Sequence, residues 1–179
     1  MPADQRGAPG AVAASGGTAL PVLRIGQGFD VHRFSDEVGR PLLLGGVAFP
    51  GERGLAGHSD ADVVAHALAD ALLGAAGLGD IGLRFPDTDP AWAGADSIAL
   101  LEAVAGEVRA GGWVAQNADC TVVLEAPKLA PRRTAMCARL SAALGAPVTV
   151  KGKRAEGLGA LGRSEGIACL AVALLARAW

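Results

Sequence analysis

The chain has 179 residues, of which 51% are hydrophobic, so it is long enough for one domain with a substantial core. Its formal net charge of -2 favours neither nucleic acid nor an anionic membrane as a partner. The three cysteines form no C-x-x-C pair, which argues against a disulfide framework and against a cysteine zinc site. A chain without a disulfide framework fits a reducing compartment, so we expect a cytoplasmic location. No uninterrupted apolar run is long enough to cross a membrane.

Residues 1–20 are small, contain Pro and Gly, and lack both a basic start and a sustained apolar stretch. We expect a disordered tail there and not a signal peptide, followed by a single domain over residues 21–179. Neither G-x-G-x-x-G nor G-x-x-x-x-G-K-[ST] occurs, which argues against a Rossmann fold and a P-loop.

The hydrophobic pattern and the turn residues predict an α/β sandwich, with a mixed sheet covered by helices on one face. Ser59 is the expected N-cap of the first helix, and Gly74 its expected end. The last segment is apolar almost all round, which predicts a buried helix. In chain order the expected elements are strand 23–33, hairpin 41–49, helix 57–74, irregular loop 77–90, helix 97–110, strand 119–125, helix 131–145, strand 148–151, loop 152–162 and helix 164–178.

Two histidines and one aspartate form a candidate metal site. Asp30 and His32 are two residues apart on a predicted strand, so they point to the same face. His66 lies at the edge of the apolar stripe of the first helix, where Asp62 or Asp70, four residues to either side, could hold one of its ring nitrogens. Together the three supply the N/N/O donors of a catalytic zinc with an open position.

The structural alternatives are that Asp30 and His32 form hydrogen bonds at the end of a strand, and that His66 is a core histidine with ordinary hydrogen-bond partners. His58 competes for the metal role, but one helix would place it about 12 Å from His66 along its axis. We therefore assign His58 to the helix start, where backbone N–H groups attract anions.

Charge is unevenly distributed along the chain. Residues 54–107 contain one basic residue, whereas residues 126–155 contain seven and no acid, so one region suits cations and the other anions. The aspartates Asp80, Asp87 and Asp89 are candidates for binding a polyol, with turn capping as the alternative.

Several motifs together resemble the 2-C-methyl-D-erythritol 2,4-cyclodiphosphate synthase family, and the resemblance covers about residues 23–177. No single fragment is decisive, but their order and spacing are specific. The motifs are GQGFDVH at 26–32, GHSDAD at 57–62 followed by His66, GDIG at 79–82, FPDTDP at 85–90, APK at 126–128 and GRSEGIAC at 162–169.

The resemblance implies a homotrimer with its sheets toward the three-fold axis and its active sites at subunit interfaces. The implied reaction converts 4-diphosphocytidyl-2-C-methyl-D-erythritol 2-phosphate to the 2,4-cyclodiphosphate and CMP in the non-mevalonate isoprenoid pathway. Asp30, His32 and His66 match zinc ligands, and Glu156 matches a ligand of Mg²⁺ or Mn²⁺. His58 and Arg154 match catalytic positions. The implied substrate contacts are Asp30, His32, His58, Ser59, Asp80, Gly82, Phe85, Asp87, Asp89, Leu124, Pro127, Lys128, Leu129, Ala130, Lys153, Glu156, Ala160 and Arg163.

The chain departs from the family pattern at two places. Arg154 stands where the family has a threonine thought to aid the transition state, and Ala160 replaces a usual phenylalanine. Arginine can contact a phosphate but is larger than threonine. A trimeric metabolite-binding protein without turnover and a zinc-dependent phosphohydrolase are the rival hypotheses.

Overall fold

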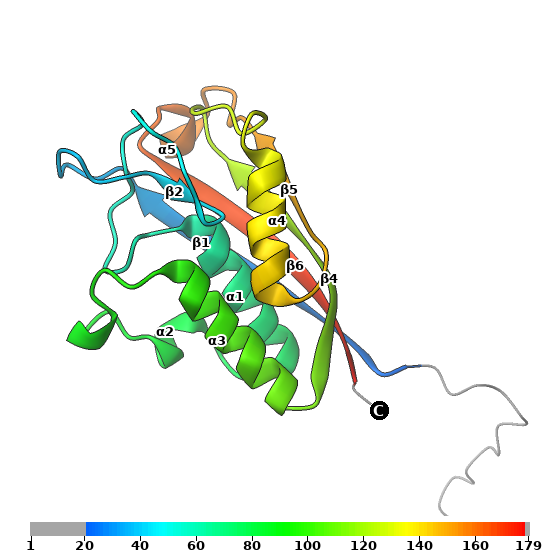
Figure 1. Cartoon of the computed structure of the whole chain (residues 1–179). Helices are drawn as coiled ribbons and strands as arrows, with labels where there is room; N and C mark the ends of the chain where they lie inside the picture. Colours follow the sequence, from blue (N-terminus) through cyan, green and yellow to red (C-terminus); the bar gives the residue numbers. More distant parts are fainter. Residues whose placement is uncertain (1–20, 178–179) are drawn as a thin grey trace, which may run out of the picture.

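A computed structural model describes residues 21–177 and contains one four-stranded sheet, in the order β1-β6-β4-β5 (Figure 1). Strand β6 (Gly166–Arg177) is antiparallel to both β1 (Leu23–Arg33) and β4 (Trp113–Val123). Strand β5 (Val148–Lys153) is parallel to β4, so the predicted mixed sheet is confirmed. The predicted tail, residues 1–20, lies outside the described residues.

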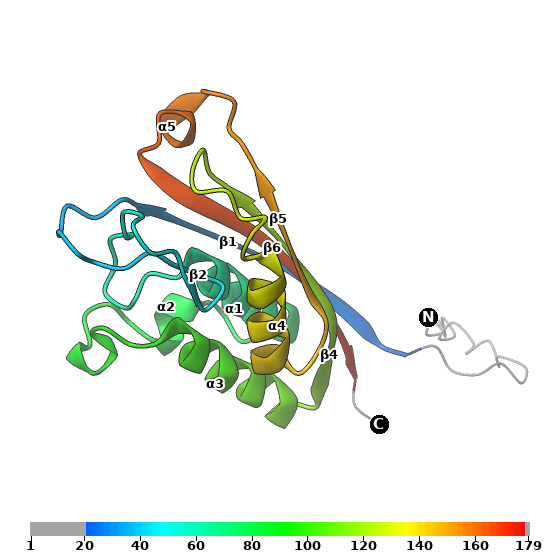
Figure 2. The same ribbon diagram turned by 45° about the horizontal axis from the view of Figure 1, so that its top comes forward.

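Three helices cover one face of the sheet, as predicted (Figure 2). They are α1 (Val63–Ala76), α3 (Ser97–Ala110) and α4 (Arg133–Leu144), and α1 lies against β1 and β6. Within residues 21–177, no helix combines the length and the apolar composition that crossing a membrane requires. The short elements are β2 (Leu43–Leu44), β3 (Val47–Ala48), α2 (Ile81–Arg84), the 3-10 helix η1 (Pro90–Trp92) and α5 (Gly159–Gly162).

The predicted ends of the first helix are wrong. Its N-cap is Asp62, whose carboxylate accepts from the backbone N–H groups of Val64 and Ala65, and its C-cap is Gly77 in a left-handed conformation. Asp62 also accepts from the N–H groups of Gly45 and Gly46, at 2.8 and 2.6 Å, which ties α1 to the β2–β3 turn. Residues 57–61 are therefore a loop before the helix.

The last segment is strand β6, and its prediction as a helix is wrong. Alternate residues of β6 face α1 and are fully buried, whereas Leu170 and Val172 point to the opposite face and are partly exposed. Because both faces of this strand are apolar, its sequence lacks the alternation that identifies a half-buried strand. Pairing on both edges, with β1 and β4, outweighs the helical preference of Ala and Leu.

Other segments also differ from the predictions. The segment 77–90 contains α2 and the start of η1, because Asp80 and Asp89 cap short helices that its many Gly and Pro residues obscured. Strand β4 begins at Trp113, earlier than predicted, and the loop after β5 contains α5. The strand over 23–33 is confirmed to the residue.

Glycines allow β1 and α1 to approach very closely. A Cβ atom built on Gly28 would lie 1.9 Å from the carbonyl oxygen of Ala67, and one built on Gly26 would lie 2.0 Å from that of Ala71. Both obstructing atoms belong to the backbone of α1, so a side chain would have to push the whole helix away from the strand.

Gly28→Ala is therefore expected to lower the free energy of unfolding by about 3 kcal/mol or more, measured by urea denaturation. Gly74→Ala is the matched control, because its Cβ would meet only the carbonyl oxygen of Gln27, at 3.9 Å. This control should gain up to about 1 kcal/mol, since alanine favours a helix interior over glycine. Equal stabilities of the two variants would contradict the close packing.

Candidate active site

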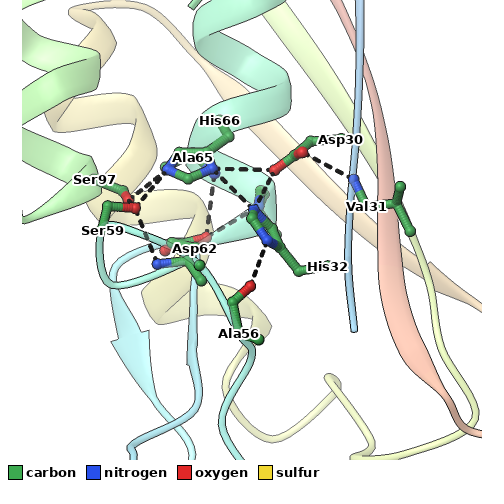
Figure 3. Close-up of polar contacts among 12 residues, drawn as sticks. Asp30, Val31, His32, Ala56, Ser59, Asp62, Ala65, His66 and Ser97 are labelled. Atoms are coloured by element: carbon green, nitrogen blue, oxygen red, sulfur yellow. Dashed lines mark hydrogen bonds and ion pairs between the residues drawn. The ribbon is translucent and has the colours of Figure 1, made fainter. Parts of the chain in front are cut away.

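Asp30, His32 and His66 converge where β1 passes the first turns of α1 (Figure 3). The Oδ2 atom of Asp30 lies 3.0 Å from Nε2 of His32 and 3.1 Å from Nδ1 of His66, and the two nitrogens are 3.3 Å apart. Four ligands around a zinc ion at about 2.0–2.1 Å lie about 3.3 Å from one another. The three atoms therefore fit three corners of a zinc site, and among the described residues they form the one such group of histidine, cysteine and acidic side chains.

The second nitrogen of each imidazole has a partner of its own. Nδ1 of His32 lies 2.8 Å from the carbonyl oxygen of Ala56, and Nε2 of His66 lies 2.8 Å from Oγ of Ser97 and 3.2 Å from Oγ of Ser59. These contacts leave Nε2 of His32 and Nδ1 of His66 facing the common point, an arrangement typical of metal-binding histidines.

The prediction that Asp62 or Asp70 holds His66 is wrong. Asp62 caps α1, and Asp70 accepts a hydrogen bond from the N–H group of Ile81 at 2.8 Å. On a helix the residues at i−4 and i+4 do share a face, but both carboxylates have backbone partners elsewhere. The partner of His66 is instead Ser97, which starts α3 and which the sequence placed only at the start of the predicted helix 97–110.

The loop before α1 is held by Arg40. Its guanidinium donates to three backbone carbonyls, at 2.6 Å for Leu55, 3.1 Å for Gly57 and 2.5 Å for Ser59. His58 lies on this loop, with Nε2 3.0 Å from the carbonyl oxygen of Asp89, and it is not part of the group formed by Asp30, His32 and His66. The structure thus brings His66, and not His58, to Asp30 and His32.

Asp30 and His32 perturb each other's pKa. Burial alone would raise the pKa of Asp30, but its contacts with the imidazoles of His32 and His66 outweigh this effect and bring the pKa well below the usual range. Burial alone would lower the pKa of His32, but the hydrogen bond and the charge of Asp30 outweigh it, so the pKa is raised above 6.5. In the metal-free protein His32 therefore keeps its proton to a higher pH than a free imidazole does.

Metal affinity is expected to fall on acidification through this raised pKa. Below it, binding a metal requires loss of the His32 proton, so the affinity should fall by about tenfold for each pH unit. Above it the affinity should level off. Competition titrations of Zn²⁺ between about pH 5.5 and 8.5 measure this dependence. An affinity that does not change over this range would contradict the raised pKa of His32.

Seven of the predicted residues line a pocket of about 260 Å³ beside the three converging side chains, here called the histidine pocket: His32, His58, Ser59, His66, Gly82, Phe85 and Asp87. Asp80 and Asp89 instead cap helices, so the alternative reading applies to these two aspartates. Trp92 also lines this pocket and was not predicted from the sequence; its ring meets that of Phe85 edge-on, with centroids 4.9 Å apart. A tryptophan in a loop rich in Gly, Pro and Asp was the available signal.

A second pocket, of about 340 Å³, lies where β4 and β5 end, and we call it the basic pocket. It contains the predicted residues Leu124, Pro127, Lys128, Leu129, Ala130, Lys153 and Arg154. Arg154 is paired with Glu125, whose Oε2 lies 2.8 Å from its Nε and 2.7 Å from its Nη2. This guanidinium lowers the pKa of Glu125. Glu125 and Arg133 also line the pocket, and the sequence did not single them out as site residues.

The predicted residues Glu156, Ala160 and Arg163 line neither pocket. Glu156 follows β5 in a left-handed conformation, with φ of 52°, and is exposed. Ala160 is in α5, and Arg163 forms an ion pair of 2.7 Å with Glu165. A larger hollow, of about 750 Å³ between segments 35–42 and 48–54, contains none of the predicted residues, so pocket volume alone does not identify a functional site.

Known proteins share both the sequence and the fold. The model of the YgbB family matches residues 23–176. The 2-C-methyl-D-erythritol 2,4-cyclodiphosphate synthases of Bordetella petrii and Azoarcus are 58% and 57% identical, over 87% of this chain and 97% of their own.

Solved structures agree with this match. The bifunctional IspDF of Campylobacter jejuni has a TM-score of 0.84 at 42% identity, covering 88% of this chain and 43% of its own. The CDP complex of IspF from Plasmodium falciparum has a TM-score of 0.76 at 30% identity, covering 90% of this chain and 100% of its own. The match over nearly all the described residues shows that this chain belongs to the YgbB family, together with these cyclodiphosphate synthases.

Proposed function

We propose that the protein converts 4-diphosphocytidyl-2-C-methyl-D-erythritol 2-phosphate to 2-C-methyl-D-erythritol 2,4-cyclodiphosphate and CMP, in the non-mevalonate isoprenoid pathway. The observation that carries the proposal is the convergence of Asp30, His32 and His66 beside a pocket suited to a small polar ligand. A relative named for this activity is 58% identical over 87% of the chain. We place the activity in a single domain, residues 21–179, and in the cytoplasm.

In this reaction the main tasks of the protein are to position the phosphates and to neutralise their negative charge. An oxygen of the 2-phosphate attacks the β-phosphorus, and the bond from that phosphorus to the CMP oxygen breaks. The attacking phosphate is already anionic at neutral pH, so no strong base is needed. The protein has to align the two phosphates and neutralise the charge that builds up between them.

The chain's own groups fit these tasks. His58 and Ser59 face the histidine pocket and would donate to the phosphates, while Gly82, Phe85 and Asp87 would hold the erythritol. Asp80 and Asp89 would act by shaping this loop through the helices that they cap. The basic pocket would take the cytidine between Leu124 and Ala130, with Lys128 and Lys153 near its phosphates.

Two metal ions complete the proposed site. Asp30, His32 and His66 would hold zinc, and Glu156 would hold Mg²⁺ or Mn²⁺. Such ions supply positive charge to a diphosphate under attack.

We further propose a homotrimer with its sheets toward the three-fold axis. The sheet face opposite the helices exposes Ile25, Phe29, Val31, Leu170 and Val172, an apolar surface that a second copy would cover. The two pockets share no lining residue, and in the proposed trimer the histidine pocket of one subunit would adjoin the basic pocket of the next, so that one substrate reaches both. Arg163 and Ala160 would then lie near the axis.

Phosphorus NMR of one reaction mixture tests the proposed activity. Protein supplied with Zn²⁺ and Mg²⁺ is expected to consume the substrate and to give signals of the cyclic diphosphate and CMP. Release of inorganic phosphate would indicate a phosphohydrolase instead. Bound but unchanged substrate would indicate a binding protein without turnover.

Arg154→Ala is expected to lower kcat/KM by about tenfold or more, because it removes a charged hydrogen-bond donor from the proposed phosphate site. Glu125→Gln is the matched comparison, since it removes the ion pair and keeps the guanidinium. Steady-state kinetics of both variants, and of Arg154→Thr, measure the contribution. Full activity of Arg154→Thr would show that the arginine is only tolerated at this position.

A further inference from the structure

Asp60 and Ser97 form a hydrogen-bonded chain behind His66, on the opposite side of its imidazole from Asp30. Oγ of Ser97 contacts both Nε2 of His66, at 2.8 Å, and Oδ1 of Asp60. Oδ2 of Asp60 accepts from the backbone N–H of Ser97 at 3.1 Å. Figure 3 shows Ser97 and Ser59 at one nitrogen of His66 and Asp30 at the other.

The direction of these hydrogen bonds follows from counting protons. An ionised carboxylate can only accept, so the single hydroxyl proton of Ser97 goes to Asp60. The oxygen of Ser97 can then only accept from His66, which requires a proton on Nε2. A neutral imidazole carries one proton, so Nδ1 keeps its lone pair, and Nδ1 is the atom that faces Asp30 and His32.

Without these hydrogen bonds the opposite tautomer of His66, with its proton on Nδ1, would be more populated. Oδ2 of Asp30 lies 3.1 Å from Nδ1 of His66 and attracts a proton to that nitrogen. The hydroxyl of Ser59 lies 3.2 Å from Nε2, but no hydrogen bond to a carboxylate fixes its proton. Ser59 alone can therefore act as donor or acceptor toward His66, and it does not select a tautomer.

We propose that Asp60 and Ser97 are positioning residues that hold His66 as its Nε2–H tautomer and so present Nδ1 to a divalent cation. The inference rests on the proposed function only for the purpose of the cation. Ser97 is 1% exposed, which shields these hydrogen bonds from competition with water.

Nitrogen NMR of the full-length, metal-free protein labelled with ¹⁵N-histidine tests the proposal directly. The chain has three histidines, so His66 is assigned by comparison with His32 and His58 variants. In the unaltered protein His66 should show a pyrrole-like Nε2 and a pyridine-like Nδ1. Ser97→Ala and Asp60→Asn should each shift the proton of His66 toward Nδ1. Ser97→Ala removes the oxygen that accepts from Nε2. In Asp60→Asn the amide can donate to the hydroxyl oxygen of Ser97, and this hydroxyl can then donate to Nε2 instead of accepting from it.

The same variants should bind Zn²⁺ about 10- to 100-fold more weakly in competition titrations. Asp96→Asn is the matched control: this neighbouring aspartate caps α3 through the N–H of Ile98 at 2.8 Å and touches no candidate ligand. It should change neither the tautomer nor the affinity. Ser97→Thr keeps the hydroxyl, so it should retain the Nε2–H tautomer of His66 and the Zn²⁺ affinity of the unaltered protein.

An unchanged His66 spectrum or an unchanged Zn²⁺ affinity in Ser97→Ala would overturn the proposal. Ser97→Ala removes only a hydroxyl, so this variant tests the proposal even if Asp60→Asn folds poorly. Neither measurement uses the substrate. A protein that behaves as expected here but releases no CMP would refute the proposed reaction alone.

Discussion

His66→Ala is expected to abolish stable zinc binding and to lower kcat/KM by about a thousandfold or more. The variant keeps Asp30 and His32, but two donors do not make the three-ligand site typical of catalytic zinc. Losing several kcal/mol of charge stabilisation at the β-phosphate corresponds to a rate loss of this size. Metal analysis of the purified variant and steady-state kinetics measure the two effects.

His58→Ala is the matched control, because the residue lines the same pocket but faces Asp89. It should keep its zinc and lose activity only through the lost phosphate contact. A full zinc complement in His66→Ala together with loss of zinc in His58→Ala would reassign the third ligand.

Mixing two inactive variants is expected to restore about a quarter of the activity, because each active site of a ring-shaped trimer would combine pockets from two neighbouring subunits. One variant is His66→Ala, which damages the histidine pocket. The other is Ala130→Trp, which would fill the basic pocket from an exposed position. Random exchange of subunits pairs two intact pockets at about one interface in four.

The controls for this experiment are each variant alone and a mixture without subunit exchange, all of which should stay inactive. Unfolding and refolding the two variants together, followed by the phosphorus NMR assay, gives the measurement. No recovery in mixed trimers of confirmed composition would contradict an active site shared between subunits.

The sequence predicted those elements whose two faces differ in polarity. Strand β1 was predicted to the residue, because apolar residues alternate along it with glycine and polar residues. Strand β6 was missed because both of its faces are apolar. The start of α1 was misplaced because Ser59 and Asp62 are both good capping residues, and only the folded chain shows which of them meets the helix N–H groups.

The sequence predicted the three side chains that could bind a metal, but not the residues that hold them in place. Asp30 and His32 follow from strand alternation, and His66 from the scarcity of histidine and its position in a helix. Ser97 and Asp60 were not found, because they belong to segments that only the tertiary fold brings together. The same limit applies to Arg40, since a hydrogen bond to a backbone carbonyl leaves no sequence pattern.

Asp30 and His32 lie on β1 and His66 lies on α1, and the backbones of these two elements come into close contact at Gly26 and Gly28. Small zinc domains unfold when the ion is removed, because the ion contributes their folding energy. In this chain, by contrast, the packing side of α1 belongs to a large apolar core. Removal of a bound divalent ion with a chelator is therefore expected to leave the fold intact.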